Sequence, residues 1–267
     1  MSNYLKDRAN WLRKKCYQMF LSANQGHPGS VFSQIEILTY LFYADVINFK
    51  DIKGKKRDKL IISKGHATMG CYPILSNLGF FEEKHLLEIG KPNSLLKIFG
   101  NTSIPGIDAT SGSLGHGIGV GSGYAFADKS KNDFKTFVII SEGELYEGST
   151  WESALYASHQ QLDNLVVIID RNKKMILGDT EDCLRLEPIA NKWESFGFDV
   201  TSVEGHNFTS ISDGFKIINN KNGKPKLIIA NTIKGKGISF MEGVPSWHYW
   251  TKLTDEQIKI ANKDLGI

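Results

Sequence analysis

The sequence predicts an α/β fold, a single doubly wound domain with a mainly parallel sheet and helices on both faces. Strand and helix patterns alternate from residue 58 to 231, which is typical of chains that build a parallel sheet. The expected strands are short and apolar throughout, as strands covered on both faces usually are. The 267 residues contain no linker and no repeat, so we expect one domain over 1–267.

The N-terminal third is expected to be mainly helical. Residues 4–22 repeat apolar side chains on one helix face. The stretch "NQGHPGS" should break this helix with two glycines and a proline, and residues 33–44 resume helical spacing. Further helices are expected over 67–78 and 82–89, and the Gly- and Pro-rich residues 90–113 should form a loop.

The remaining elements alternate in order. Strands are expected at "DKLIIS", "TFVII", "NLVVIID", "FDVTSVEG" and "KPKLIIAN". Helices are expected at "GSLGHGIGVGSGYAFADK", "STWESALYASHQQ", "EPIANKWESFG" and "NFTSISDGFKIIN". We expect Ser149 or Thr150 to cap the second of these helices. The glycine series lacks G-x-G-x-x-G and precedes its strand, so we expect close packing or a flat ligand there instead of a dinucleotide.

Composition excludes several classes of partner. A net charge of +3 is too small to predict nucleic-acid binding, and the basic run over 50–59 has no interleaved aromatic residue and is expected to be a solvated loop. The sequence has no stretch of about 18 apolar residues, so we expect no membrane association. The three cysteines show no metal-binding spacing, which favours reduced thiols and a cytoplasmic location.

Polar groups follow four expected strands, in "SKGHA", "SEGE", "DRNKK" and "NTIKGKG". Ligands of such sheets bind at the carboxyl ends of the strands. Glu142 and Asn172 would there offer hard oxygen donors, which suit Mg²⁺ or Ca²⁺ and not zinc. Spacing alone leaves open that the two side chains share no metal, because acids and asparagines are common at strand ends.

Seven motifs occur in an order that resembles the N-terminal half of transketolases. They are "ANQGHPGS", "SKGHA", "PGIDATSGSLGHG", "EGELYEGSTWESALYASHQQLDNLVVIIDRN", "EPIANKWESFGF", "IKGKGISFME" and "WHYW". The chain resembles the separate N-terminal subunit of a split enzyme. The resemblance implies a transferase that moves a two-carbon ketol unit between sugars or sugar phosphates, with nucleotide sugars as another substrate class. It also implies thiamine diphosphate, Mg²⁺ (with Ca²⁺ as a substitute) and a separate C-terminal pyrimidine-binding subunit in a two-plus-two assembly.

The resemblance also assigns roles to residues. His27 would bind substrate and transfer protons, His66 would touch the cofactor diphosphate, and His248 would lie near diphosphate and substrate. We expect these three histidines to be catalytic. The remaining assignments are Gly112, Ser113, Leu114, Gly143, Glu144 and Asn172 (with His66 and His248) on the cofactor, and Glu142, Asn172 and the Lys174 carbonyl on the metal.

Several positions depart from the family pattern. Glu142 replaces the usual metal-binding aspartate and Ser141 the usual glycine. The family's "GHP" segment, with a further substrate histidine, is replaced by "GNTSIPG", in which Asn101 is nearest. Many relatives have Gln where His116 stands. Three alternatives stay open: a deoxyxylulose-phosphate synthase-like enzyme, a 2-oxo acid decarboxylating component, and a non-catalytic regulatory subunit.

Overall fold

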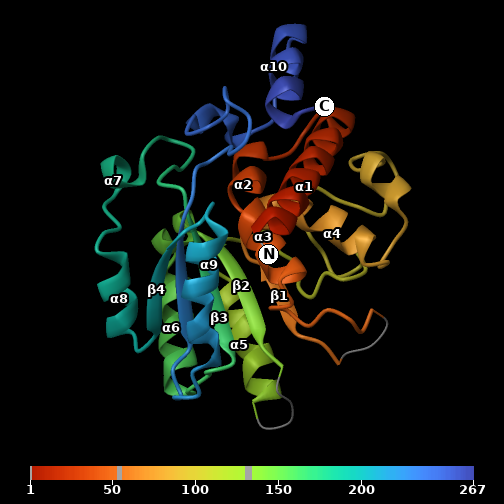
Figure 1. Cartoon of the computed structure of the whole chain (residues 1–267). Helices are drawn as coiled ribbons and strands as arrows, with labels where there is room; N and C mark the ends of the chain where they lie inside the picture. The colour runs from red at the N-terminus through yellow and green to blue at the C-terminus, as the bar shows by residue number, and fades with distance from the viewer. Residues whose placement is uncertain (1, 53–55, 130–133) are drawn as a thin grey trace.

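Five parallel strands form the sheet in the part of the chain that the structure describes. Figure 1 shows the computed structural model, in which residues 2–52, 56–129 and 134–267 are described. The strand order is β1-β2-β3-β5-β4. The strands are β1 (Lys59–Ile62), β2 (Thr136–Ser141), β3 (Leu165–Arg171), β4 (Asp199–Glu204) and β5 (Lys226–Asn231). All five expected strands and the doubly wound α/β fold are confirmed.

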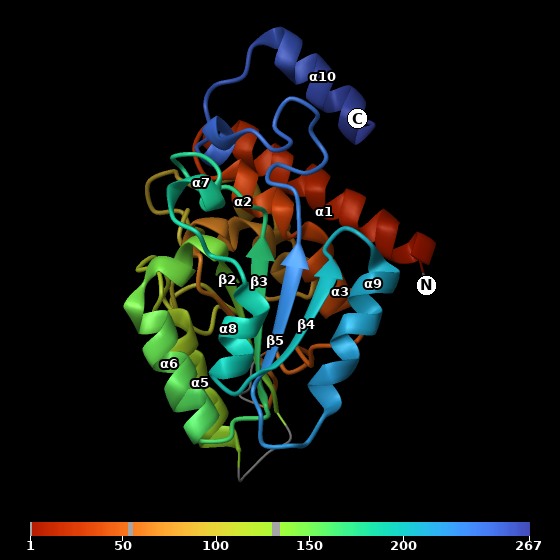
Figure 2. The ribbon, with the colours of Figure 1, turned by 90° about the vertical axis from the view of Figure 1, so that its left-hand side faces the viewer.

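Helices cover both faces of the sheet, as Figure 2 shows. The core on one face includes α1 (Ser2–Ala23), α2 (Pro28–Ser33), α3 (Ile35–Tyr43), α4 (Tyr72–Asn77) and α9 (Phe208–Phe215). Helix α10 (Asp255–Leu265) lies beyond the carboxyl ends of the strands and contacts α1. The other face packs against α5 (Gly117–Asp128), α6 (Gly148–His159) and α8 (Ile189–Ser195). Strand β3 contributes side chains to the hydrophobic cores on both faces of the sheet. Val166 and Ile168 lie in the first core, and Val167 and Ile169 lie in the second. This alternation follows from the two-residue period of a strand.

The expectation of apolar strands is wrong for β4. This strand pairs only with β5 among the described residues, so it lies at the edge of the sheet. Its sequence, "DVTSVE", keeps only Val203 fully buried. An edge strand has one neighbour and less cover, and polar side chains are tolerated there.

Three expected helix boundaries need correction. The break after α1 is shorter than expected, because α2 begins at Pro28, where a missing N–H costs nothing. The expected helix 67–78 is a 3₁₀ helix, η1 (Gly65–Cys71), followed by α4. Glu147 holds the N-cap position of α6, so Ser149 and Thr150 lie in its first turn and do not cap it.

Several short elements were not expected from the sequence. They are α7 (Thr180–Cys183), α10 and the 3₁₀ helices η3 (Glu142–Tyr146) and η5 (Pro245–His248). The expected helices 82–89 and 207–219 contain η2 (Glu83–Leu87) and end in η4 (Lys216–Asn219), respectively. The Thr254–Gln257 capping box and the left-handed Gly266 are the sequence signals that mark α10.

The glycines of α5 serve close packing. A Cβ on Gly121 would lie 2.4 Å from Cγ2 of Val138 on β2. The first of the two expectations for the glycine series, close packing, is therefore confirmed at this position.

The other predictions concern loops, cysteines and membranes. Residues 90–113 contain no helix or strand, which confirms the expected loop. The basic run 50–59 includes residues 53–55, which lie outside the described part of the chain. Cys16 and Cys71 are buried, and Cys183 is exposed. Among the described residues, no helix is both long enough and apolar enough to span a membrane.

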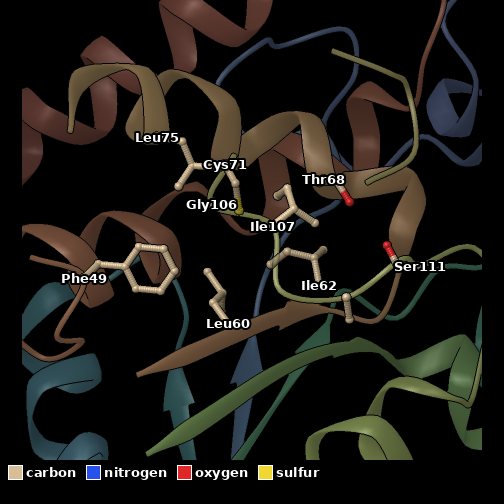
Figure 3. Close-up of a pocket in the computed structure, with 10 residues that line it drawn as sticks. Phe49, Leu60, Ile62, Thr68, Cys71, Leu75, Gly106, Ile107 and Ser111 are labelled. Carbon is tan, nitrogen blue, oxygen red and sulfur yellow. The ribbon is translucent and has the colours of Figure 1, made fainter. Parts of the chain in front are cut away.

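A small cavity lies beside β1, between this strand, η1 and the 106–111 loop (Figure 3). Its volume of about 10 Å³ corresponds to the space that one water molecule needs. Its lining is mostly apolar, with Phe49, Leu60 and Ile62 among the side chains. This cavity is a packing gap and too small for a substrate.

Candidate functional site

The carboxyl ends of the central strands border a second cavity, of about 260 Å³. The register pairs Ser141 of β2 with Asp170 of β3, and Arg171 of β3 with Asn231 of β5. The groups that follow β1, β2, β3 and β5 therefore meet at one edge of the sheet. Figure 2 shows this edge beside α2 and α7.

Most of the residues predicted for the site reach this cavity. Its lining includes His66, Leu114, Glu142, Gly143, Asn172, Lys174 and His248. His27 lies behind the lining, in ring contact with two of its histidines. Gly112 and Ser113 are exposed and outside the lining. A Cβ on Gly65 would lie 2.7 Å from the Gly112 nitrogen, so this turn packs against the residue that precedes His66.

Glu144 does not line the cavity, although it was expected to bind the cofactor. Its fully buried carboxylate accepts hydrogen bonds from the Ser63 hydroxyl, from the Gly115 N–H at 3.0 Å and from the Ser141 N–H at 2.8 Å. These bonds tie the ends of β1 and β2 to the 112–115 turn. Glu144 therefore positions the backbone around the site.

Three histidines form a cluster at the cavity. The ring centroids of His27, His66 and His248 are separated by 5.1 to 5.3 Å. Burial, followed by the nearby Lys234 charge, lowers the pKa of His27 to about 4 and that of His248 to about 3. Burial also holds the pKa of His66 well below its usual range. All three imidazoles are therefore neutral at pH 7, and each can donate or accept a proton.

The imidazole nitrogens differ in their hydrogen bonds. His66 Nε2 lies 3.0 Å from the Ser30 hydroxyl on α2. His27 Nδ1 is buried and has no hydrogen-bond partner among the described residues. Because a buried polar nitrogen usually has a partner, this atom is available for a hydrogen bond to a ligand group.

Lys234 is a site residue that the sequence reasoning missed. Its side chain is 2% exposed and its Nζ lies 3.3 Å from His248 Nδ1. No carboxylate of the described residues forms an ion pair with it. Burial lowers its pKa to about 8, and the more distant Asp170 and Glu142 charges offset this only in part. An ammonium group without an ion-pair partner is costly to bury, which favours an anion at this place. The motif "NTIKGKG" after β5 was the signal that pointed to this position.

A second buried lysine is compensated. Lys64 Nζ forms an ion pair of 2.5 Å with Asp170, which also accepts hydrogen bonds from the Ser33 and Thr232 hydroxyls. The Asn172 side-chain nitrogen donates to the same carboxylate at 3.4 Å. Asp170 therefore orients the Asn172 amide, whose oxygen accepts from the Lys174 N–H.

Two of the predicted metal donors converge. The Lys174 N–H donates to Glu142 Oε1 at 2.8 Å and to Asn172 Oδ1 at 3.2 Å. The other Glu142 oxygen accepts from Nη1 of Arg171, a residue without a predicted role. Burial raises the pKa of Glu142 to about 7, against the opposing effect of Arg171. The described residues contain no cluster of three or more His, Cys, Asp or Glu side chains that could hold a metal.

Phe99, directly before the substituted segment "GNTSIPG", lies beside the histidines. The Phe99 ring lies 5.7 Å from that of His27. Asn101, in contrast, accepts a hydrogen bond from the Ser103 N–H at 2.9 Å within its own turn. His116 is exposed at the N-cap position of α5 and does not line the cavity.

Comparison with known proteins identifies relatives over nearly the whole chain. Residues 6–267 match the family described as transketolase, thiamine diphosphate binding domain. One subunit of the apulose-4-phosphate transketolase from Actinobacillus succinogenes is 40% identical over 98% of this chain and 95% of its own length. The corresponding subunit from Phocaeicola vulgatus is 38% identical over 95% of this chain and 91% of its own length.

Solved structures extend the comparison to longer chains. The transketolase from Campylobacter jejuni superposes with a TM-score of 0.89 at 30% identity, over 98% of this chain. The match covers only 43% of that transketolase. The chain thus spans less than half of a solved transketolase chain, but nearly the full length of the two apulose-4-phosphate transketolase subunits.

Proposed function

Because the chain belongs to the family of transketolase thiamine diphosphate-binding domains, we propose that it is the diphosphate-binding subunit of a split transketolase. A single domain over 1–267 is part of this proposal. The observation that carries it is the buried, uncompensated Lys234 beside three neutral histidines. A cation without a counter-ion, in a cavity at the strand ends, fits a diphosphate group.

Lys234, His66 and His248 are the residues that we propose for the diphosphate. The Lys234 ammonium supplies charge, and the two imidazoles supply hydrogen-bond donors. Gly143 follows Glu142 directly, and a Cβ there would meet only Ser141 Oγ, at 3.7 Å. The backbone at Gly143 is therefore open to a close-lying ligand.

The donor set at the strand ends fits Mg²⁺. Glu142 Oε1 and Asn172 Oδ1 both lie at the Lys174 N–H, and all available donors are oxygens, which Mg²⁺ and Ca²⁺ prefer. We propose that these two side chains and the Lys174 carbonyl hold the metal. Glu144 supports them through the Ser141 backbone.

Thiamine diphosphate, when bound, supplies the carbanion chemistry of ketol transfer. This chain supplies the proton traffic and the placement of the substrate. We propose that His27 accepts and returns a proton through its unpartnered Nδ1, and that His66 and His248 keep its imidazole in place. Imidazole suits this task, because it can both accept and donate a proton. In the cofactor-free chain the low pKa values of these histidines work against proton uptake, and the negative charge of a bound diphosphate would raise them. Phe99 would border the substrate, and the Gly112–Leu114 turn, with Ser113, would border the cofactor.

Two observations support a separate partner subunit: the names of the relatives and the exposed apolar surface of this chain. Both relatives are named as one lettered subunit of a transketolase, which implies a second subunit. Exposed apolar side chains occur on α5, on α6 and in the segment before α7; they are Val120, Phe126, Leu155, Tyr156, Ile176 and Leu177. Exposed apolar surface of this kind marks interaction sites. We propose a C-terminal pyrimidine-binding partner in a two-plus-two assembly, and sugar phosphates as substrates.

The alternatives are less well supported. Both relatives are named as transketolase subunits, not as a deoxyxylulose-phosphate synthase or a decarboxylating component. A regulatory subunit would not need a neutral histidine cluster around an uncompensated lysine. The cytoplasmic location stays a prediction, which localisation of a tagged chain would test.

The test is reconstitution of activity. The chain is co-expressed with candidate pyrimidine-binding subunits, and ketol transfer is measured with ketose phosphate donors, thiamine diphosphate and Mg²⁺. We expect activity only from the pair, and thiamine diphosphate binding by calorimetry. A pair that binds the cofactor without transferring any ketol unit would favour the regulatory role. Full activity of this chain alone would refute the split enzyme.

A further inference from the structure

Arg171 lies where the proposed metal site meets the protein interior. It ends β3, directly before Asn172, and its side chain is 2% exposed. Nη1 is ion-paired with Glu142 Oε2, while Glu142 Oε1 faces the Lys174 N–H. The two oxygens of one carboxylate thus point to two different neighbours.

Arg171 also binds the segment that follows. Nη1 donates to Thr180 Oγ1 at 2.9 Å, and Nη2 lies 3.1 Å from both Glu181 Oε1 and Glu187 Oε1. The side chains of these two glutamates are 38% and 55% exposed. The guanidinium therefore has two further carboxylates besides Glu142.

The ion pair changes the charge of the donor set. Glu142 is the single acid among the three proposed metal donors, and Arg171 neutralises it. A divalent cation would have to share this carboxylate with a fixed guanidinium, which repels it. Glutamate is longer than the aspartate usual at this position, which suits binding to two partners. One Glu142 oxygen pairs with Arg171, and the other lies at the Lys174 N–H beside the proposed metal position.

We propose that Arg171 is a built-in counter-ion of the metal site that lowers its affinity for divalent cations, and that Glu181 and Glu187 moderate this effect. The inference rests on the proposed function, since it assumes that Glu142 holds the metal. The negative charges of Glu181 and Glu187 offset part of the guanidinium's positive charge, so less of it acts on Glu142. They also keep Arg171 paired when Glu142 turns to a cation.

The test measures Mn²⁺ binding, with Mn²⁺ as the probe for Mg²⁺. Free Mn²⁺ is followed by electron paramagnetic resonance in titrations of the full chain at pH 8 with saturating thiamine diphosphate. Arg171→Met keeps the side-chain length and removes the charge, and we expect Mn²⁺ to bind at least about tenfold more tightly. The pair Glu181→Gln and Glu187→Gln should act in the opposite direction and weaken binding severalfold, because Glu142 is then the one carboxylate that remains paired with Arg171 among the described residues. These two glutamates are partly exposed, so this variant tests the inference even if Arg171→Met does not fold.

A matched control breaks a buried arginine–carboxylate pair elsewhere. Arg57 binds Asp108 with two hydrogen bonds of 2.7 and 2.8 Å near the start of β1. Arg57→Met should lower the melting temperature and leave Mn²⁺ affinity unchanged. Without Mn²⁺, Arg171→Met should have a lower melting temperature than the wild-type chain. Addition of Mn²⁺ should raise it again, because the cation then pairs with Glu142.

Several outcomes would overturn the inference. Equal or weaker Mn²⁺ binding by Arg171→Met would do so, as would unchanged affinity in the Glu181→Gln, Glu187→Gln variant. If neither the wild-type chain nor any of these variants bound Mn²⁺, the inference would also fail, because the chain would then have no metal position. The proposed function is judged separately, by thiamine diphosphate binding and by ketol transfer with the partner.

Discussion

Replacing Lys234 by methionine separates ligand binding from folding. Burial lowers the pKa of Lys234 from 10.5 to about 8. Since this pKa lies above 7, the folded chain keeps the ammonium charged at pH 7 and carries its full desolvation cost. The lowering corresponds to about 3 kcal/mol. Lys234→Met removes this cost, so the free chain should be stabilised by up to about 3 kcal/mol, or about 6 °C in melting temperature.

The effect of Lys234→Met on the free energy of unfolding depends on pH. Between about pH 8 and 10.5 the unfolded chain keeps the Lys234 proton that the folded chain has lost. The stability of the wild-type chain therefore rises with pH across this window. The advantage of Lys234→Met should be largest at pH 7 and vanish near pH 10.5.

The same substitution should weaken cofactor binding. A hydrogen bond from a charged donor contributes about 1.5–3 kcal/mol. Its loss should raise the Kd for thiamine diphosphate roughly 10- to 100-fold. Calorimetry gives the Kd, and thermal melting of the cofactor-free chain between pH 7 and 10 gives the stability.

Lys226 provides a matched control. It is also fully buried, but its Nζ is paired with Asp199 at 3.0 Å and with Asn222 at 2.6 Å. Lys226→Met should lower stability and leave the Kd unchanged. An unchanged Kd in Lys234→Met would refute its diphosphate role, and a lower melting temperature at pH 7 would refute the uncompensated charge.

Three further predictions concern other site residues. Asn172→Ala should raise the Kd for thiamine diphosphate in Mg²⁺ more than about tenfold, which calorimetry would detect; equal Kd values would contradict its metal role. His27→Gln should lower the rate of ketol transfer by the reconstituted pair at least ~10²-fold and change the melting temperature by only a few degrees; unchanged turnover would exclude proton transfer by His27. Glu144→Ala should cost about 2 kcal/mol or more, because it leaves the buried Ser63 and Gly115 donors without an acceptor; unchanged urea denaturation would contradict its positioning role.

Most of the sheet could be predicted because β1, β2, β3 and β5 are short apolar runs. The polar residues after these runs then had to reach the same edge, and Glu142, Asn172 and His66 do so. The break after α1 was overestimated, because Pro28 and Gly29 were interpreted as helix breakers. Proline is well tolerated in the first helical turn, and the apolar residues that follow are buried on α2.

Side-chain direction was harder to predict than strand position. Glu142 and Glu144 are two residues apart, and in an extended strand their side chains would point to the same side. They lie instead in the 3₁₀ helix η3, which directs them differently, and only Glu142 lines the cavity. The Arg171–Glu142 pair depends on the register of β2 against β3, which the sequence does not specify. The exposure of β4 depends on the strand order, which places β5 between β3 and β4.

The three buried cations around the cavity differ in how they are compensated. Lys64 is neutralised by Asp170 and Arg171 by Glu142, whereas Lys234 has no carboxylate partner among the described residues. Both acids at the strand ends are thus already paired, and the protein leaves one positive charge for a diphosphate. That single charge is less than the diphosphate carries, so a divalent cation would supply the remainder. A donor set with no net charge should in turn bind the cation weakly until the diphosphate adds its oxygens. Binding of each should therefore strengthen binding of the other by the same factor, as linkage requires.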